Sequence, residues 1–306
     1  MSLRKFKYYT YNGLLSVLPR HFFYWKKARL LSRLSKYDEY EISSRLNYYN
    51  KLSMHFDSTQ SDFSIKNFRK TGGTTYYLDL IKVIKGFEPS FRFDFAPGDV
   101  TKVPMRPSFV KSRPISEDNT NAVLLKLNAV RHFNFVDDKL AFQDKLDKIV
   151  WRGLGKKPHR KLVLEKFHDH PMCDIGRVAP IEGEPYEKGF LSIAEQLKYK
   201  FILAIEGNDV ASNLKWAMSS NSVVVMCKPK YETWFMEGRL VAGVHYVQVA
   251  DDYSDLVDKL KYYSSNPSKA QEIISNAHQW IAQFQDPEKE QLLSLLVAKK
   301  YFENAM

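Results

Sequence analysis

Short apolar segments alternate with segments of helical spacing along the second half of the sequence, from about Lys148 onward. Apolar runs bounded by turn residues indicate buried strands, whereas apolar residues that recur every three or four positions indicate amphipathic helices. Strands that alternate with helices favour a parallel sheet with helices on both faces. We expect strands at 148–153, 173–179, 200–205, 222–227 and 245–249, and helices at 159–170, 189–199, 210–219, 252–264, 267–284 and 287–303.

The first half of the sequence is also mixed α/β, but it is less regular. Its alternating and apolar segments predict strands at 90–95, 108–112 and 121–128. A chain of 306 residues is long for one small core and suits two domains. Because ligands of open α/β sheets bind at the carboxyl ends of the strands, we expect the functional site in a cleft that such domains face.

The formal net charge of +11 favours an anionic partner, such as a nucleic acid, a nucleotide or an acidic membrane surface. Residues 1–36 contain nine Lys or Arg residues and no Asp or Glu, with aromatic residues between them. We call this segment the basic leader and expect it to form part of the N-terminal domain or to pack on it. No run of 18 apolar residues occurs, so no transmembrane helix is expected. Cys173 and Cys227 give no disulfide framework, which fits a reducing compartment.

The stretch "KFILAIEGNDVASNLKWAM" reads as a strand, a turn at Gly207 and a helix. The first turn of a helix has unpaired N–H groups and a partial positive charge, which together suit a phosphate. The alternative is that Asn208 or Asp209 caps the helix and no ligand binds there.

The stretch "WRGLGKKPHR" places Arg152 and Arg160 around a glycine-rich turn that follows a predicted strand. Arginine binds phosphate oxygens through two parallel N–H groups, and glycine lets the backbone approach them closely. The alternative is an exposed basic loop. The phosphate-binding pattern GxxxxGK[ST] is missing here.

The sequence does not predict a metal site. His168 and His170 lie two residues apart and have no third ligand nearby in the sequence, and no D-x-D pair that would hold Mg²⁺ against a diphosphate follows a strand. Glu232 is a candidate acceptor for ribose hydroxyl groups, whereas Trp234 is more typical of a core residue.

Together these motifs resemble glycosyltransferase family 90, over roughly residues 91–284. In the C-terminal half the resemblance is carried by "YKFILAIEGNDVASNLKWAMSSNSVVV", "YETWF", "GVHYVQV" and the "AQEI" helix. Upstream, "WRGLGKKPHR" is similar to an aromatic-Arg-Gly…Arg element of the family. "GDVTKVP", followed by "SFVKS", is similar to a stretch in which an aspartate lies five residues before a proline. The basic leader, "FVKSRPI" and "LLKLNAVRHF" resemble the bacterial lipopolysaccharide branch rather than the protein O-glucosyltransferases.

The resemblance implies a GT-B fold, in which two Rossmann-like domains face a cleft. It implies a UDP-sugar held mainly by the C-terminal domain, an acceptor that enters from the N-terminal domain, and inverting transfer without a metal or other cofactor. Asp99 matches the position of the family's catalytic aspartate. The residues that would contact or surround the donor are Arg152, Gly153, Arg160, Gly207, Ala211, Ser212, Lys215 and Glu232. At Lys215 eukaryotic members usually have an arginine, and a lysine cannot make the same paired contact.

We therefore expect the basic leader (1–36), an acceptor-side domain (37–147), a donor-binding domain (148–285) and a C-terminal helix (286–306) that could cross back to the N-terminal domain. The expected function is transfer of a hexose from a UDP-sugar to a lipopolysaccharide core or a related glycan. The expected location is the cytoplasm, peripheral on the anionic inner membrane. One alternative acceptor is a protein. A second alternative, from another class, is a basic nucleic-acid-binding protein without catalysis. No nucleic-acid-binding motif is found, so no such partner is expected.

Overall fold

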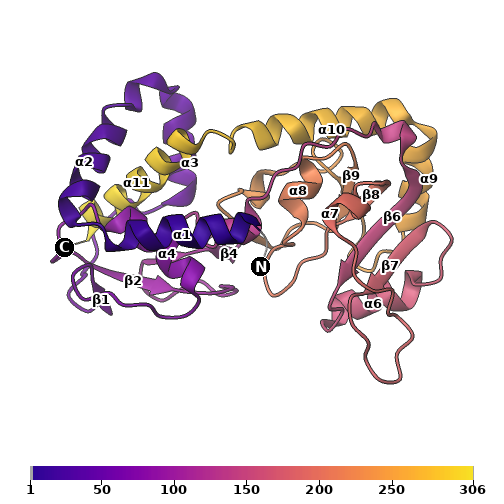
Figure 1. Ribbon diagram of the computed structural model, residues 1–306, viewed down its shortest axis with the longest axis horizontal. Helices are drawn as coiled ribbons and strands as arrows, with labels where there is room; N and C mark the ends of the chain where they lie inside the picture. The colour runs from indigo at the N-terminus through magenta and orange to yellow at the C-terminus, as the bar shows by residue number, and fades with distance from the viewer. Residues whose placement is uncertain (1–2, 306) are drawn as a thin grey trace. The chain divides into compact units, whose positions relative to one another are not determined.

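The computed structural model describes residues 3–305, and it is a mixed α/β structure with parallel sheets (Figure 1). The chain forms two compact units. Unit 1 takes the described residues up to His132, the segment Lys230–Gly238 and those from Phe284 onward. Unit 2 takes Phe133–Pro229 and Arg239–Gln283.

Unit 2 contains a parallel sheet in the order β11-β9-β8-β6-β7. Its strands are rich in β-branched residues that are buried on both faces, as parallel sheets covered by helices require. The strands are β6 (Leu146–Gly153), β7 (Cys173–Arg177), β8 (Tyr199–Leu203), β9 (Val223–Met226) and β11 (Val247–Gln248). The helices are η2 (Phe142–Asp144), α6 (Pro158–Phe167), α7 (Ile193–Gln196), α8 (Leu214–Met218), α9 (Leu256–Ser265) and α10 (Pro267–Ala282). The short helix η3 (Glu237–Arg239) begins in unit 1 and ends in unit 2 along the chain. The predicted parallel sheet of the second half is thus confirmed.

Unit 1 contains a second sheet in the order β1-β2-β3-β5, in which β1 is antiparallel to β2 and the others are parallel. A separate antiparallel pair joins β4 to β10. The strands are β1 (Phe63–Ser64), β2 (Arg92–Ala96), β3 (Ser108–Val110), β4 (Ser112–Pro114), β5 (Ala122–Leu124) and β10 (Tyr231–Thr233). The helices are α1 (Leu3–Val17), α2 (Arg20–Leu31), η1 (Leu34–Lys36), α3 (Glu39–Tyr49), α4 (Thr74–Ile84), α5 (Ala129–His132) and α11 (Pro287–Asn304).

The basic leader forms helices α1 and α2, which pack on unit 1. The Tyr8 hydroxyl donates to Asp79 Oδ1 at 2.8 Å on α4, and Lys85 donates to the carbonyl of Ser16 at 2.8 Å. Phe23 is buried, and α2 lies beside α11, drawn in yellow in Figure 1. Packing within unit 1 therefore fixes one side of each leader helix.

The unit boundaries differ from the predicted domain boundaries in two places. Residues 133–147 belong to unit 2 rather than to the first domain, because Phe142 of η2 is buried in its core and the Leu146 N–H at the start of β6 donates to the Lys198 carbonyl. The segment 230–238 belongs to unit 1, because β10 pairs with β4. Helix α11 also belongs to unit 1.

The helix after Gly207 is shorter than predicted. Helix α8 begins only at Leu214, because residues 207–213 form bends and turns and the Asn213 side chain donates to the Leu203 carbonyl at 2.9 Å.

Residues 3–305 contain no helix that is long and apolar enough to cross a membrane. The same residues contain no cluster of three or more His, Cys, Asp or Glu side chains placed to hold a metal ion.

Candidate functional site

The strand order of unit 2 defines one position where a ligand is expected to bind. The first strand in sequence, β6, lies between β7 on one side and β8 on the other, and the later strands continue outward from β8. The connections after β6 and β8 therefore leave the carboxyl edge of the sheet in opposite directions. Open α/β sheets bind ligands in the crevice at such a switch point. The two loops that border it contain the two predicted donor motifs, around Gly153 and Gly207.

Arg160 joins these two loops. It lies in the first turn of α6, and its Nε and Nη2 donate to the carbonyl oxygens of Glu206 and Ile205, both at 2.9 Å. A methyl group added at Gly207 would lie 3.4 Å from Arg160 Nη2. The structure thus places Arg160 and Gly207 side by side at the switch point.

His159 is a residue of this region that the sequence interpretation missed. Its Nε2 lies 2.9 Å from the Glu206 carbonyl oxygen, so the imidazole and the Arg160 guanidinium hold the same peptide group. A carbonyl oxygen accepts only, so His159 Nε2 must carry the proton. The only sequence signal was its place between two basic residues and a proline, which is too common to indicate a role.

The end of β6 and the loop that follows it each require a glycine. A Cβ at Gly153 would lie 2.4 Å from the Trp151 ring. Gly155 has a φ of +64°, and a Cβ there would lie 2.6 Å from Leu164. The sequence pattern was interpreted only as a backbone that lets a phosphate approach closely. The structure shows that these glycines are also needed because Trp151 and Leu164 pack against them.

Arg152 lies at the end of β6, but its guanidinium is held by β7. It donates to the Asp174 carbonyl and to Asp174 Oδ1, each at 2.7 Å, and Tyr199 donates to the other carboxylate oxygen. Burial of Asp174 acts to raise the pKa of its carboxyl group, but the hydrogen bonds from Tyr199 and Arg152 outweigh it and hold the pKa below its usual value. Arg152 is therefore one partner of an ion pair on the sheet, whereas Arg160 is held by the loop after β8.

The predicted residues after Gly207 lie in different environments. Ser212 is exposed, whereas Ala211 is buried. Lys215 is fully buried within α8. The Lys215 side chain is thus enclosed by protein, and its contact with a donor diphosphate stays a prediction.

Glu232 belongs to β10 in unit 1, where its carboxylate is buried. Arg113 Nε donates to Oε1 at 2.7 Å, and the Tyr48 hydroxyl donates to Oε2. Burial and the negative charge of Glu232 raise the pKa of Tyr48. Both carboxylate oxygens thus accept hydrogen bonds within a buried network, and contact between Glu232 and a ribose stays a prediction.

Asp99 lies in unit 1, in the loop that follows β2, after Gly98, whose φ is +96°. Lys111 follows the neighbouring parallel strand β3, and its Nζ lies 2.5 Å from Asp99 Oδ1. The loop is fixed where the Val100 N–H donates to Ser112 Oγ at 3.0 Å. The carboxyl ends of two parallel strands thus place a partly exposed carboxylate beside a buried ammonium group.

Asp94 is the nearest alternative to Asp99, and its environment is structural. It is buried in β2, accepts from the Asp62 N–H at 2.8 Å and pairs with Arg106 at 3.2 Å. Its carboxylate is thus engaged by other residues of unit 1.

Comparison with known proteins settles the family. The sequence model of glycosyl transferase family 90 matches residues 119–289, which is more than half of the chain. The chain belongs to glycosyl transferase family 90. The resemblance predicted from the motifs is therefore confirmed.

Two similar proteins show which activities occur among the relatives' names. The family 90 chain described here is 45% identical over 302 residues to O-glucosyltransferase LpsA of Dichelobacter nodosus, covering 97% of this chain and 95% of the relative. It is 25% identical over 167 residues to Protein O-glucosyltransferase 3 of Rattus norvegicus, covering 52% of this chain and 32% of the relative.

Proposed function

We propose that the protein transfers a hexose from a UDP-sugar to a lipopolysaccharide core or a related glycan. The observation that supports the donor side is the switch point of unit 2, where Arg160, Gly207 and the glycine loop after β6 lie at the carboxyl edge of the sheet. The acceptor side is supported by the similarity over nearly the whole chain to a relative named O-glucosyltransferase LpsA.

In this proposal the two units act as the halves of a GT-B enzyme, and the reaction inverts the anomeric centre. The Asp99 carboxylate takes the proton of the acceptor hydroxyl group as that oxygen attacks the anomeric carbon. The bond between the anomeric carbon and the diphosphate oxygen breaks, and UDP leaves with the electron pair. Arg160 and the peptide groups of the glycine loops would stabilise the negative charge that develops on the diphosphate. Lys111 forms an ion pair with Asp99 and holds its carboxylate in place.

A protein acceptor is the second candidate, because the similarity to Protein O-glucosyltransferase 3 covers about half of this chain. A third candidate, nucleic-acid binding without catalysis, rests only on the net charge of +11.

Thermal unfolding separates the proposal of a UDP-sugar donor from the third candidate, nucleic-acid binding. UDP should raise the melting temperature and an oligonucleotide should not; stabilisation by the oligonucleotide alone would refute the proposal.

Arg160→Ala should weaken UDP binding by roughly 1.5–3 kcal/mol, the scale of a hydrogen bond to a charged group. Arg160→Lys should recover only part of this loss, because a lysine lacks the paired N–H groups. Titration calorimetry with UDP measures both. Lys166→Ala is the matched control, since it removes a positive charge from the same helix at a site that pairs with Asp252, and its affinity should stay at the wild-type value.

Arg152→Ala should also weaken UDP binding by roughly 1.5–3 kcal/mol if Arg152 contacts the diphosphate. It should in addition lower the melting temperature, because it removes the arginine that pairs with the partly buried Asp174 carboxylate. If the melting temperature falls while UDP affinity is unchanged, Arg152 is structural. Unchanged UDP affinity in both the Arg152 and the Arg160 variants would refute the assignment of the donor site.

Transfer should continue in excess EDTA, because the proposal assigns the neutralisation of the diphosphate to arginine and backbone N–H groups rather than to a cation. The measurement is UDP release from a UDP-hexose in the presence of acceptor, with and without EDTA. Loss of turnover in EDTA that Mn²⁺ restores would contradict metal-independent transfer.

The proposal also places the protein at the cytoplasmic face of the inner membrane, as a peripheral protein. The basic leader supports this location, because each Lys or Arg near an anionic bilayer contributes about 1 kcal/mol of attraction. Nucleic acid is not a partner in this proposal.

A further inference from the structure

Helix α1 presents an apolar face that unit 1 does not cover. Four large apolar side chains, Leu3, Phe6, Leu14 and Val17, are 69%, 55%, 65% and 78% exposed. At 3.6 residues per turn, these four positions fall within an arc of roughly 80° on the helix surface. Scattered exposed apolar residues are ordinary, but four on one stripe of a single helix form a contiguous patch.

The opposite side of α1 is attached to unit 1. Tyr8 donates to Asp79 on α4, and Asn12 and Leu15 are buried. These three positions lie about half a turn from the apolar stripe. The contacts of α1 within unit 1 therefore hold the stripe outward, so that it does not need to detach in order to bind something.

The charge beside this stripe indicates what binds it. Arg4 and Lys7 are exposed on the first two turns of α1, and the basic leader contains no Asp or Glu. A helix with Phe and Leu on one face and Lys or Arg beside it lies in the plane of a lipid interface, where binding strength follows buried apolar area and attraction to anionic lipids. A second copy of the same surface would bring like charges together, which opposes self-association through this face.

We propose that the exposed face of α1, formed by Leu3, Phe6, Leu14 and Val17 with Arg4 and Lys7 beside it, inserts into the headgroup region of an anionic bilayer. This inference deepens the proposed function, since it names the surface at which the transfer to a membrane-anchored glycan would take place.

Co-sedimentation with lipid vesicles tests the proposal on the full chain. Phosphatidylcholine vesicles supply a neutral surface, and vesicles that also contain phosphatidylglycerol supply an anionic one. The wild-type protein should bind the anionic vesicles more tightly, and the binding should weaken as salt is added. Phe6→Ser/Leu14→Ser should weaken binding to anionic vesicles by about tenfold or more. Arg4→Gln/Lys7→Gln should weaken it by roughly fivefold for each charge removed.

The control for general surface hydrophobicity is Phe190→Ser, which removes an exposed aromatic residue in unit 2 and should bind vesicles as the wild type does. Wild-type affinity for vesicles in the Phe6→Ser/Leu14→Ser variant, with an unchanged melting temperature, would overturn the proposal. Equal binding of the wild type to neutral and anionic vesicles would overturn it as well.

Light scattering on the same samples addresses the other possible occupant, a second copy of the chain. A wild-type dimer that Phe6→Ser/Leu14→Ser converts to a monomer, without loss of vesicle binding, would assign this face to self-association instead. Transfer to a water-soluble oligosaccharide acceptor should be unchanged in this variant. If the wild type transfers no sugar to any acceptor, the proposed function is wrong. The vesicle experiment tests membrane binding by α1 independently of that result.

Discussion

Replacing Asp99 with asparagine should lower kcat by about 10²–10⁴-fold, the usual effect of removing a general base. The variant keeps the shape of the side chain and an oxygen that can accept from Lys111, but it cannot take a proton from the acceptor. UDP affinity should stay at the wild-type value, because the proposed donor contacts belong to unit 2. Kinetics under saturating donor and acceptor measure the change directly.

Asp94→Asn is the informative comparison for this experiment. Asp94 is a buried partner of Arg106 and of the Asp62 N–H. Its replacement should therefore lower the free energy of unfolding, while kcat per folded molecule stays close to the wild-type value. If Asp99→Asn keeps more than about a third of the wild-type kcat, well outside the expected range, the catalytic base is another residue.

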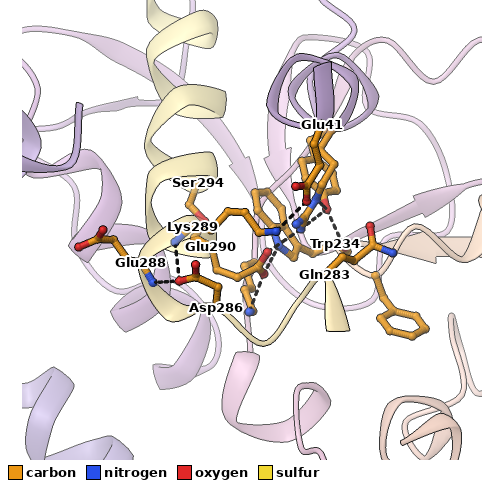
Figure 2. A network of polar contacts seen from close by, with 12 residues as sticks. Glu41, Trp234, Gln283, Asp286, Glu288, Lys289, Glu290 and Ser294 are labelled. Carbon is orange, nitrogen blue, oxygen red and sulfur yellow. Dashed lines mark hydrogen bonds and ion pairs between the residues drawn. The ribbon is translucent and has the colours of Figure 1, made fainter. Parts of the chain in front are cut away.

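Replacing Glu290 with alanine should destabilise unit 1 by about 3–5 kcal/mol, the usual cost of removing one partner of a buried ion pair. Figure 2 shows the network around this residue. Arg45 donates to Glu290 Oε1 at 2.6 Å, and Lys126 and the Trp234 indole N–H each donate to Oε2 at 2.7 Å. The variant leaves the buried Arg45 guanidinium and the Lys126 ammonium group without their counter-charge.

The position of Glu290 explains why this effect is large. The carboxylate joins α11 to α3 through Arg45 and to the segment after β10 through Trp234, which stacks on Tyr49 with ring centroids 3.8 Å apart. Asp286 caps α11 by accepting from the N–H groups of Glu288 and Lys289 at 2.9 and 3.0 Å, which fixes the start of the helix that carries Glu290.

Urea unfolding followed by circular dichroism measures the free energy of unfolding for this variant. Glu303→Ala is the matched control on the same helix, since Glu303 pairs with Lys299 at the surface. An exposed pair of this kind contributes at most about 1 kcal/mol. A loss of the same size in both variants would show that the buried network contributes no more than a surface pair does.

The sheet of unit 2 was predictable because its signals are local. Strands β6, β8 and β9 are runs of buried apolar residues between turns, and their observed limits lie within two residues of the predicted ones. The alternation with helices then required parallel strands. Helix α8 was predicted to be twice its length, because the apolar spacing after Gly207 is helical while the hydrogen bond from Asn213 to Leu203 that delays the helix is a tertiary contact.

Two of the predicted site residues have partners that lie far away in the sequence. Arg152 is held by Asp174, 22 residues later, and Glu232 is held by Arg113, 119 residues earlier. A basic or acidic residue beside a glycine turn looks the same in sequence whether it faces a ligand or a buried partner. The helices of the basic leader were likewise not predicted, because charge and aromatic content dominate its pattern and one of the two residues that α1 buries, Asn12, is polar.

The most direct test of the account is a transfer reaction on a defined acceptor. Lipopolysaccharide from a strain in which the gene is deleted would be incubated with the purified protein and each of several UDP-hexoses, with EDTA present, and analysed by mass spectrometry. The account predicts that one donor adds a single hexose to the core and releases an equal amount of UDP, and that Arg160→Ala and Asp99→Asn both reduce this product. The account would be contradicted if the mass of the core stayed unchanged with every UDP-hexose. This holds whether the protein modifies a polypeptide acceptor instead or modifies no acceptor at all.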